Sequence, residues 1–373
     1  MTTWHLLAPE YPPACGGVGD YTALVAGGLA DAGDGVHVWH SGVDSALDTI
    51  RASRVAVHRL PDRFGRQSRD RIEAGIAHTP GTVLVQYVPG AFGLLGMNIP
   101  FCRWLARLHR RGVDVRVMFH EPFFYFGLAR PWRNGFAIAQ RSMAAILLRG
   151  SARAYYSTET WTRLLAPFGA APRTEVLPIP STIPIETSEE AVAGWRMRRR
   201  GTFVVGHFGT YGEHIGTRLA AILPMLMRRL IDAHVVLVGE GGRAFAAALP
   251  ADVRDRVEVT GRLAPSDTTA ALRACDLLLQ PYPDGVTTRR TSVMAALATG
   301  VPVLTTSGAL TEPVWKETEA VALAPADDIA AIVEIVARLA DDAPARVALG
   351  ARGRRTYDER FALGLTIERL RAA

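Results

Sequence analysis

The stretch LLLQPYPDGVTTRRTSVMAALATGVPVLTT, residues 277–306, carries the pattern that decides the fold. The apolar run Leu277–Pro281 predicts a buried strand, and the segment near 288–299 predicts a helix that ends at Gly300. A second apolar run, Val301–Thr305, follows at once. A strand, a helix and another apolar strand in succession indicate a parallel β-α-β unit. The crossover helix brings the chain back to the end of the sheet where the first strand began, so both strands run in the same direction.

The same alternation extends in both directions from this stretch. Apolar runs of this kind predict parallel strands buried on both faces, so we expect an α/β protein with doubly wound sheets. The other expected strands are Trp4–Ala8, Val36–His40, Val55–His58, Thr82–Tyr87, Val115–His120, Ala152–Ser157 and Thr174–Leu177, then Phe203–Phe208, His234–Val238, Val257–Thr260 and Val321–Leu323. The other expected helices lie near 20–33, 67–78, 100–111, 134–149 and 158–166, then near 215–230, 265–274, 326–340 and 344–371.

The segment Leu177–Arg200 interrupts this alternation. It contains Pro178, Pro180 and Pro184 and ends in the charged run WRMRRR. Such a segment is typical of a linker between domains. We therefore expect an N-terminal domain to about residue 185 and a C-terminal domain from about residue 200, with a cleft enclosed by the two.

The composition is that of a folded globular chain. It has 373 residues, 49% of them apolar and 21% charged, which excludes disorder, a coiled coil and collagen. No apolar run reaches the roughly 18–20 residues that span a bilayer, and the start MTTWHLLAPEYPP lacks the basic segment of a signal peptide. Three widely spaced cysteines, Cys15, Cys102 and Cys275, predict reduced thiols and a cytoplasmic protein.

The net charge of +6 comes from 42 basic and 36 acidic residues, and Lys316 is the one lysine. This excess of arginine permits phosphate-bearing ligands but also fits a solvated surface, and we expect no nucleic-acid partner. The sequence holds no Asp-X-Asp triplet and no cluster of metal-binding residue types. We therefore expect neither a metal site nor a bound cofactor.

The residues that follow each strand are the first candidates for a site, because ligands of such sheets bind at the carboxyl ends of strands. Gly16, Gly17 and Gly19 lead from the first strand into a helix, a pattern that suits close approach of a phosphate. A dinucleotide fingerprint fits poorly, because Thr22 stands in place of its third glycine and the second strand ends without an acidic residue. A plain flexible loop is the other alternative.

His120 and Glu121 follow another strand and are the candidate catalytic residues. A histidine at a strand tip is expected to be exposed to the cleft, where it can donate to a sugar hydroxyl or to a developing charge. A lone histidine is also often structural. The segment FFYFGLARPW, residues 123–132, comes next, and its aromatic rings suit either a sugar or simple packing.

Further candidates come from the second half of the chain. Gly209-Thr210 and Gly239-Glu240 follow successive strands and form either ligand-binding turns or ordinary ones. At the start of the helix near 288–299, hydroxyls are expected to cap the helix. Two arginines in the same turn are unfavourable next to the positive end of the helix dipole, unless a bound anion compensates their charge. This combination predicts a cradle for a diphosphate. Its residues are Thr288, Arg289, Arg290, Thr291 and Ser292.

Together these motifs resemble those of the retaining glycosyltransferases of family 4, the group 1 glycosyl transferases, which have the GT-B fold. PPACGGVGDY, residues 12–21, is similar to the glycine loop of that family. VVLVGEGG, residues 235–242, and VEVTGRLAPSD, residues 257–267, are similar to two of its later turns, and residues 277–306 to its donor-site segment. His120 stands where the family has a histidine, and the resemblance covers nearly the whole chain.

The resemblance implies an enzyme that moves a sugar from a nucleotide diphosphate sugar to an acceptor hydroxyl with retention of anomeric configuration. A phosphate oxygen of the donor would take the acceptor proton, so the protein orients the donor and stabilises the leaving diphosphate. The acceptor is a small molecule or is linked to a lipid. The resemblance also implies an acceptor-side domain 1–185, a donor-binding domain 200–354, and a last helix, 355–373, that crosses back onto the first domain.

The resemblance also implies roles for the candidates. His120 would contact the donor sugar. The residues expected to hold the diphosphate are Gly16, Gly17, Gly209 and Thr210 together with the cradle, and those expected near the nucleoside are Gly239, Glu240, Arg262 and Leu263.

Two departures from the family pattern keep other hypotheses open. Thr287 and Ala295 stand where the family has two glutamates, and His214 and Arg218 stand near the place of its usual Arg and Lys. Arg289 and Arg290 are expected to supply the missing charge. The second hypothesis is a non-catalytic GT-B partner subunit that binds a nucleotide or a glycosyltransferase, and the third, weakened by the poor fingerprint, is a nicotinamide enzyme.

The expected helix 100–111 allows two interpretations of its basic face. Its arginines accompany the apolar residues Trp104, Leu105 and Leu108, a combination that can bind anionic lipid. We expect instead that the apolar stripe packs on the sheet and the arginines face water, so peripheral membrane contact is not favoured.

Overall fold

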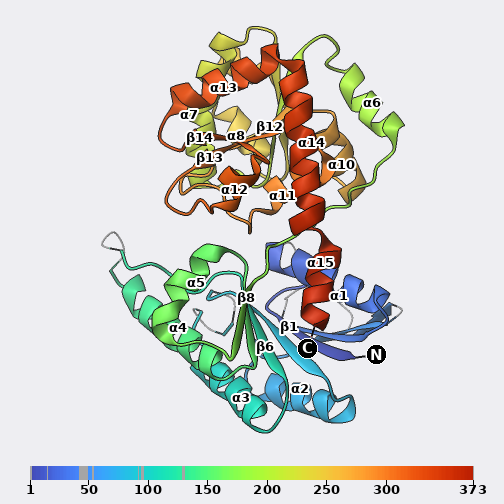
Figure 1. Ribbon diagram of the computed structural model, residues 1–373, viewed down its shortest axis with the longest axis vertical. Helices are drawn as coiled ribbons and strands as arrows, with labels where there is room; N and C mark the ends of the chain where they lie inside the picture. Colours follow the sequence, from blue (N-terminus) through green and yellow to red (C-terminus); the bar gives the residue numbers. More distant parts are fainter. Residues whose placement is uncertain are drawn as a thin grey trace. The chain divides into compact units, whose positions relative to one another are not determined.

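The computed structural model (Figure 1) describes residues 2–14, 16–41, 49–52, 54–90, 92–93, 96–127 and 131–372. Cys15 and residues 128–130 of the aromatic segment therefore lie outside the described residues. The chain divides into two units, which are described separately. The first unit consists of Met1–Pro178 with Leu363–Ala373, and the second of Ile179–Ala362.

The first unit is built on an eight-stranded sheet in the order β3-β4-β2-β1-β5-β6-β7-β8. Seven of its strands run parallel, and β3 pairs antiparallel with β4 at the edge. Each predicted strand of this half is confirmed within two residues, whereas β3 was not predicted. The bounds are β1 Thr3–Ala8, β2 Gly35–His40, β3 Thr49–Ala52, β4 Val55–Arg59, β5 Thr82–Tyr87, β6 Val115–Phe119, β7 Arg153–Tyr156 and β8 Arg173–Val176.

Helices cover both faces of this sheet, which explains why its central strands are apolar throughout. All six residues of β5 are buried, because α3 and neighbouring helices pack on one side while α1 and α15 lie on the other. The apolar stripe of α3, including Trp104 and Leu105, is buried, so the packing interpretation of that helix is confirmed. The bounds are α1 Gly17–Asp31, α2 Arg66–His78, α3 Ile99–Arg110, α4 Arg133–Arg149, α5 Glu159–Leu165, the 3-10 turn η1 Ala166–Phe168 and α15 Leu363–Arg371.

The second unit has a six-stranded, fully parallel sheet in the order β11-β10-β9-β12-β13-β14. Alternate residues of β9 point into two separate cores: Val204 faces α10 and α11, while Val205 faces α7 and α13. The predicted doubly wound architecture is therefore confirmed. The bounds are β9 Phe203–Phe208, β10 Ala233–Val238, β11 Val257–Gly261, β12 Leu277–Gln280, β13 Val303–Ser307 and β14 Ala322–Pro325.

The helices of the second unit include four that the sequence did not predict, namely α6, α8, α9 and α12. Helix α11 begins at Thr291 rather than at residue 288. The bounds are α6 Glu189–Met197, α7 Glu213–Arg229, α8 Gly242–Ala247, α9 Ala251–Arg254, α10 Pro265–Arg273, α11 Thr291–Thr299, α12 Val314–Thr318, α13 Ile329–Asp341 and α14 Ala343–Arg360. Among the described residues, no helix is long and apolar enough to cross a membrane.

The expected linker is instead part of the second unit. Val192 of α6 packs with Ala270 and Ala274 next to α10, and Glu189 pairs with Arg273 at 2.7 Å. These contacts hold the segment against the second unit, so the chain passes from one unit to the other after Pro178 rather than across residues 185–200.

The expected single helix 344–371 is two helices, α14 and α15. Phe361 ends the first of them and packs against Trp315 in the core of the second unit, at 5.7 Å between ring centroids. Ile367 lies on Gly28 of α1 in the first unit. The chain therefore crosses back after Ala362 and not at residue 355, because residues up to Arg360 belong to α14.

Candidate functional site

Several of the predicted site residues follow strands at the points where the order of each sheet reverses. In the first sheet this point lies between β1 and β5, and in the second between β9 and β12. Open α/β sheets bind ligands at the carboxyl ends of the strands at such a point. The glycine loop follows β1, and the Gly209 turn and the cradle segment follow β9 and β12.

In the first unit, the carboxylate of Glu10 lies at the amino end of α1. The amide of Gly19 donates a hydrogen bond to Oε1 of Glu10 at 3.2 Å. A Cβ atom on Gly16 would stand 1.8 Å from the same oxygen, whereas a Cβ on Gly17 would have no atom of the described residues within 4 Å. Gly16 therefore makes room for Glu10, and Gly17 faces open space. Sequence reasoning missed Glu10, which lies just before the glycine loop, residues 12–21.

His120 is buried, with 8% of its surface exposed, which corrects the expectation of an exposed histidine. Tyr21 of α1 covers it, with ring centroids 4.9 Å apart. Its Nε2 lies 2.8 Å from Oε1 of Gln86, and because that oxygen can only accept, Nε2 carries the proton. Ser157 and Trp161 both donate to its carbonyl oxygen. The contact with Tyr21 places His120 beside the helix that begins at the glycine loop.

Glu121 is half-buried and leads into the aromatic segment. The guanidinium of Arg141 lies 4.1 Å from the ring centroid of Phe123 and 4.0 Å from that of Phe126. These distances are typical of cation–π contacts, so the described part of the segment packs on a cation. Tyr125 and Phe126 nevertheless keep 56% and 55% of their surface exposed.

In the second unit, the predicted residues lie along a single edge of the sheet. Following the strand order β11, β10, β9, β12, the loops carry first Arg262 and Leu263, then Gly239 and Glu240, then Gly209 and Thr210, and finally the cradle residues 288–292. Thr210, Glu240 and Arg262 are exposed, and Leu263 is half-buried. The sequence therefore identified one continuous edge, although it could not give the spatial order of the loops.

The turns after β9 and β10 pack backbone against backbone. A Cβ on Gly239 would stand 2.2 Å from the carbonyl oxygen of Gly209, and both residues have positive φ, +125° and +152°. Glycine is therefore required at Gly239 by the fold itself. Beneath this turn, the buried ring of His207 binds the carbonyl of Leu279 at 2.8 Å, and burial lowers the pKa of His207 to about 4.

Glu312 holds the loop before α11 in place. It is buried, with 3% exposed, and accepts hydrogen bonds from the backbone amide of Thr288 and from its hydroxyl, the latter at 2.9 Å. The sequence signal for this residue was weak, because Glu312 lies on a different loop, after β13, and reaches Thr288 only in the folded protein.

The predicted hydroxyl cap of the helix is wrong. Arg290 is the N-cap residue of α11, and no side chain caps the helix. The hydroxyl of Thr288 is engaged with Glu312, and that of Ser292 lies 2.6 Å from the hydroxyl of Tyr282. The guanidinium of Arg290 lies 4.2 Å from the centroid of the Tyr282 ring. Burial raises the pKa of Tyr282, while the positive charge of Arg290 opposes this rise.

The two positions that lack the expected glutamates are both in the interior. Thr287 and Ala295 are each 1% exposed, and Ala295 belongs to the core on the α11 side of the sheet. Neither residue offers a charged group to a ribose. Among the residues that the structure describes, no three His, Cys, Asp or Glu side chains are grouped so as to hold a metal ion.

Comparisons with known proteins agree with this architecture. Residues 200–342 match the family model described as glycosyl transferases group 1. No curated protein sequence matches the chain. Sucrose-phosphate synthase from Thermosynechococcus elongatus has a similar structure, with a TM-score of 0.76, 17% identity, and coverage of 99% of this chain and 98% of that one.

Two further solved structures have the same fold. WaaG, a glycosyltransferase involved in lipopolysaccharide biosynthesis, superposes with a TM-score of 0.71 at 16% identity over 98% of both chains. Anabaena HepE in complex with UDP and glucose superposes with a TM-score of 0.69 at 15% identity, over 99% of this chain and 98% of that one. These likenesses establish the GT-B fold for the chain.

Proposed function

We propose that this protein is a glycosyltransferase that moves a sugar from a nucleotide diphosphate sugar to an acceptor hydroxyl with retention of anomeric configuration. The observation that carries the proposal is the carboxyl edge of the second sheet. The group 1 glycosyl transferase match, residues 200–342, includes every loop of that edge from Gly209 to Glu312. The complex of the similar Anabaena protein with UDP and glucose supports a UDP-linked donor.

In this proposal, the second unit holds the diphosphate of the donor. Arg289 and Arg290 precede the amino end of α11, where the helix dipole and the first amides attract negative charge. Arginine presents paired donors to phosphate oxygens. Glu312 keeps the loop in place by binding Thr288, so the cations and amides are oriented before the donor arrives. The Gly239–Glu240 and Arg262–Leu263 loops lie further along the same edge and would contact the nucleoside.

The first unit would supply His120 and the glycine loop. The hydrogen bond to Gln86 fixes the imidazole, so its contact with the donor sugar would need no reorientation. The acceptor would be a small molecule or a lipid-linked sugar. We place the protein in the cytoplasm, which the free buried thiols of Cys102 and Cys275 support.

A non-catalytic partner subunit is the second candidate function, favoured by the buried Thr287 and Ala295. The deciding experiment is a panel of UDP-, GDP- and ADP-sugars, scored for nucleoside diphosphate release and product mass. Catalysis predicts release with one donor class. Saturable nucleotide binding without release favours the partner subunit. Absence of binding to every nucleotide would overturn both the catalytic function and a partner subunit that binds a nucleotide.

The cradle itself is tested by the paired change Arg289→Gln with Arg290→Gln. Each lost charged hydrogen bond should weaken UDP binding by about 1.5–3 kcal/mol, measured by calorimetry. The control is Arg228→Gln with Arg254→Gln, which removes two exposed charges elsewhere on the second unit. Equal affinities in the two paired variants would show that Arg289 and Arg290 contribute only general charge.

A further inference from the structure

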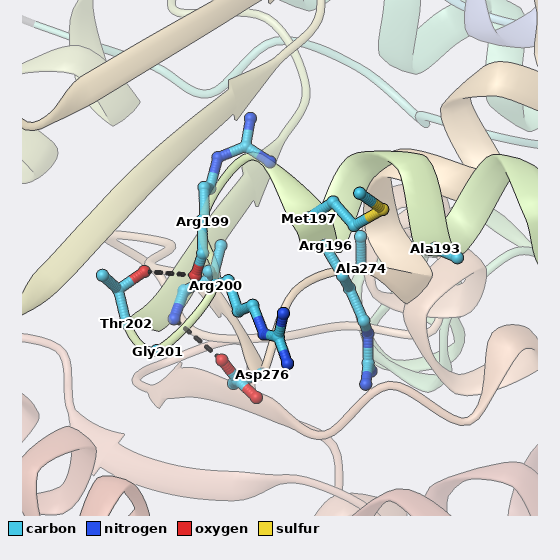
Figure 2. A pocket seen from close by; sticks show the side chains of 10 residues that line it. Ala193, Arg196, Met197, Arg199, Arg200, Gly201, Thr202, Ala274 and Asp276 are labelled. Carbon is cyan, nitrogen blue, oxygen red and sulfur yellow. Dashed lines mark hydrogen bonds between the residues drawn. The ribbon is translucent and has the colours of Figure 1, made fainter.

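A pocket of about 450 Å³ opens at the amino edge of the second sheet. Its walls come from the end of α6 and the turn that follows it, from Val204 at the start of β9, and from Asp276 directly before β12 (Figure 2). In a parallel sheet all amino ends share one edge, so this pocket lies opposite the edge that carries Gly209 and the cradle. The proposed donor site therefore does not account for it.

Three arginines line the pocket, and they differ in their partners. Arg199 is buried and pairs with Glu258, so its charge is already balanced. Arg196 and Arg200 are exposed and take part in none of the ion pairs among the described residues. Figure 2 shows their guanidinium groups turned toward the same side as Asp276, whereas Arg199 points the opposite way.

Asp276 is the one acidic side chain in the lining, and its carboxylate has a structural partner. Its Oδ2 accepts a hydrogen bond at 2.9 Å from the backbone amide of Val204, which joins the starts of two adjacent strands. The lining therefore holds one carboxylate besides the guanidinium groups of Arg196 and Arg200, of which Arg196 donates to the carbonyl oxygen of Arg273 at 3.2 Å, and the pocket retains a net positive charge. The rest of the lining includes the apolar Met197 and Ala274.

This combination specifies a class of ligand. A volume of this size accommodates a small molecule. The planar guanidinium group of arginine presents paired N–H donors whose spacing matches the oxygens of a phosphate group. We propose that the pocket binds a phosphate monoester, with the phosphate held by Arg196 and Arg200 and the organic part against Met197. Because α6 forms one wall and the sheet the other, the ligand would link the two.

The direct test is a titration of the full-length protein with inorganic phosphate at constant ionic strength, with chloride as the balancing salt. Gly201 and Thr202 line this pocket and belong to none of the loops of the proposed donor site, so their amide resonances report on binding here. We expect a saturable shift, weakened at least about tenfold by Arg196→Gln with Arg200→Gln, because two charge-assisted contacts are lost. The control pair Arg228→Gln with Arg254→Gln should change the affinity less than about twofold, because exposed distant charges are screened.

Two outcomes would overturn the proposal. One is a shift that never saturates, and the other is an equal loss of affinity in both paired variants. Arg289→Gln with Arg290→Gln should leave these two resonances responsive, so a failed donor site and a failed phosphate pocket give different results.

Two further arms identify the source of the monoester. Glycerol 3-phosphate probes a soluble ligand, and vesicles of phosphatidylcholine with phosphatidic acid probe a lipid headgroup. Binding of glycerol 3-phosphate that depends on Arg196 and Arg200 supports a soluble ligand. Vesicle sedimentation with the same dependence supports a lipid. If neither probe depends on these arginines, the assignment to a phosphate monoester is wrong.

Discussion

At the scale of single residues, Gly16 and Gly17 differ although they are adjacent. A side chain on Gly16 would overlap the carboxylate of Glu10, so the fold of the loop explains that glycine. Among the residues that the structure describes, no atom lies within 4 Å of a Cβ on Gly17. A ligand that approaches α1 would therefore meet Gly17 directly, but it would have to displace Glu10 from the amide of Gly19.

Glu10→Gln should consequently strengthen the binding of UDP. A carboxylate and a diphosphate compete for the same helix amino end, and a neutral amide competes less, so we expect a gain of roughly three- to tenfold. Calorimetric titration of the variant measures this. Gly17→Ala serves as the companion variant, with unchanged melting and weaker binding. An unchanged or lower UDP affinity in Glu10→Gln would show that the diphosphate does not use this end of α1.

His120→Gln should lower turnover by about 100-fold or more, as expected for a positioned group that contacts the reacting sugar. Gln is chosen because His120 is buried and a smaller residue would leave a cavity. UDP affinity should stay within about twofold of the wild type, because His120 would contact the donor sugar rather than the diphosphate in our proposal. Near-normal turnover would assign the histidine a purely structural role, held by Gln86 and Tyr21.

At the scale of helices and strands, local sequence was informative where it matched the packing. Thr82–Tyr87 and Phe203–Phe208 form strands with the predicted bounds, because each is an apolar run with turn residues at both ends. Helix α6 was missed because prolines and charges dominate its surroundings, and what stabilises it is tertiary contact between Val192 and α10. The break between α14 and α15 was missed for the same reason, since Phe361 is fixed by packing.

In the candidate site, too, some residues could be predicted from local sequence while others depend on tertiary contacts. Residues at strand ends could be predicted, because parallel strands bring their carboxyl ends to one edge. Glu10 and Glu312 could not, because each gains its role from a hydrogen bond to a backbone amide across a loop. The burial of His120 was also unpredictable, since it depends on where Tyr21 of another element lies.

Polar side chains of the neighbouring strands β1 and β2 are hydrogen-bonded to one another in the interior of the first unit. Trp39 donates from Nε1 to Nδ1 of His5 at 3.2 Å, and Nε2 of His5 lies 2.8 Å from the carbonyl oxygen of Thr79. These bonds require a neutral imidazole, because a proton on Nδ1 would face the indole N–H. Burial lowers the pKa of His5 to about 4, and the positive charge of a protonated His37 adds to this effect.

The free energy of unfolding should therefore fall as the pH is lowered from about 6.5 to about 4. His5 and His207 both have a folded pKa of about 4 against an ordinary value of 6.5, so the unfolded chain binds the extra protons in this window. Each contributes up to about 3 kcal/mol above pH 6.5, and this contribution is lost as the pH falls. Urea unfolding at several pH values measures the slope. His5→Leu should flatten it, and an unchanged slope in His5→Leu would contradict the assignment.

At the scale of the whole molecule, the first unit is discontinuous in sequence and the second unit is continuous. The second unit is one continuous segment, 179–362, whereas the first unit is completed only by the last residues of the chain. Arg116, which is buried, donates to the carbonyl oxygen of Leu370 at 2.6 Å, and Arg371 pairs with Asp34 at 3.0 Å. Helix α15 therefore contributes both core and buried polar contacts to the first unit.

This connectivity predicts that the two units fold differently as fragments. Fragment 179–362 contains both of its cores and should melt cooperatively on its own. Fragment 1–178 lacks α15, which leaves the guanidinium of Arg116 without its carbonyl partner and exposes the surface that Ile367 covers on α1. It should melt at a lower temperature, and a peptide of residues 363–373 should raise that temperature in a saturable manner. The same peptide with Ile367→Glu should fail, because a charge would be buried against Gly28. If fragment 1–178 melts identically with and without the peptide, α15 is not an integral part of the first unit.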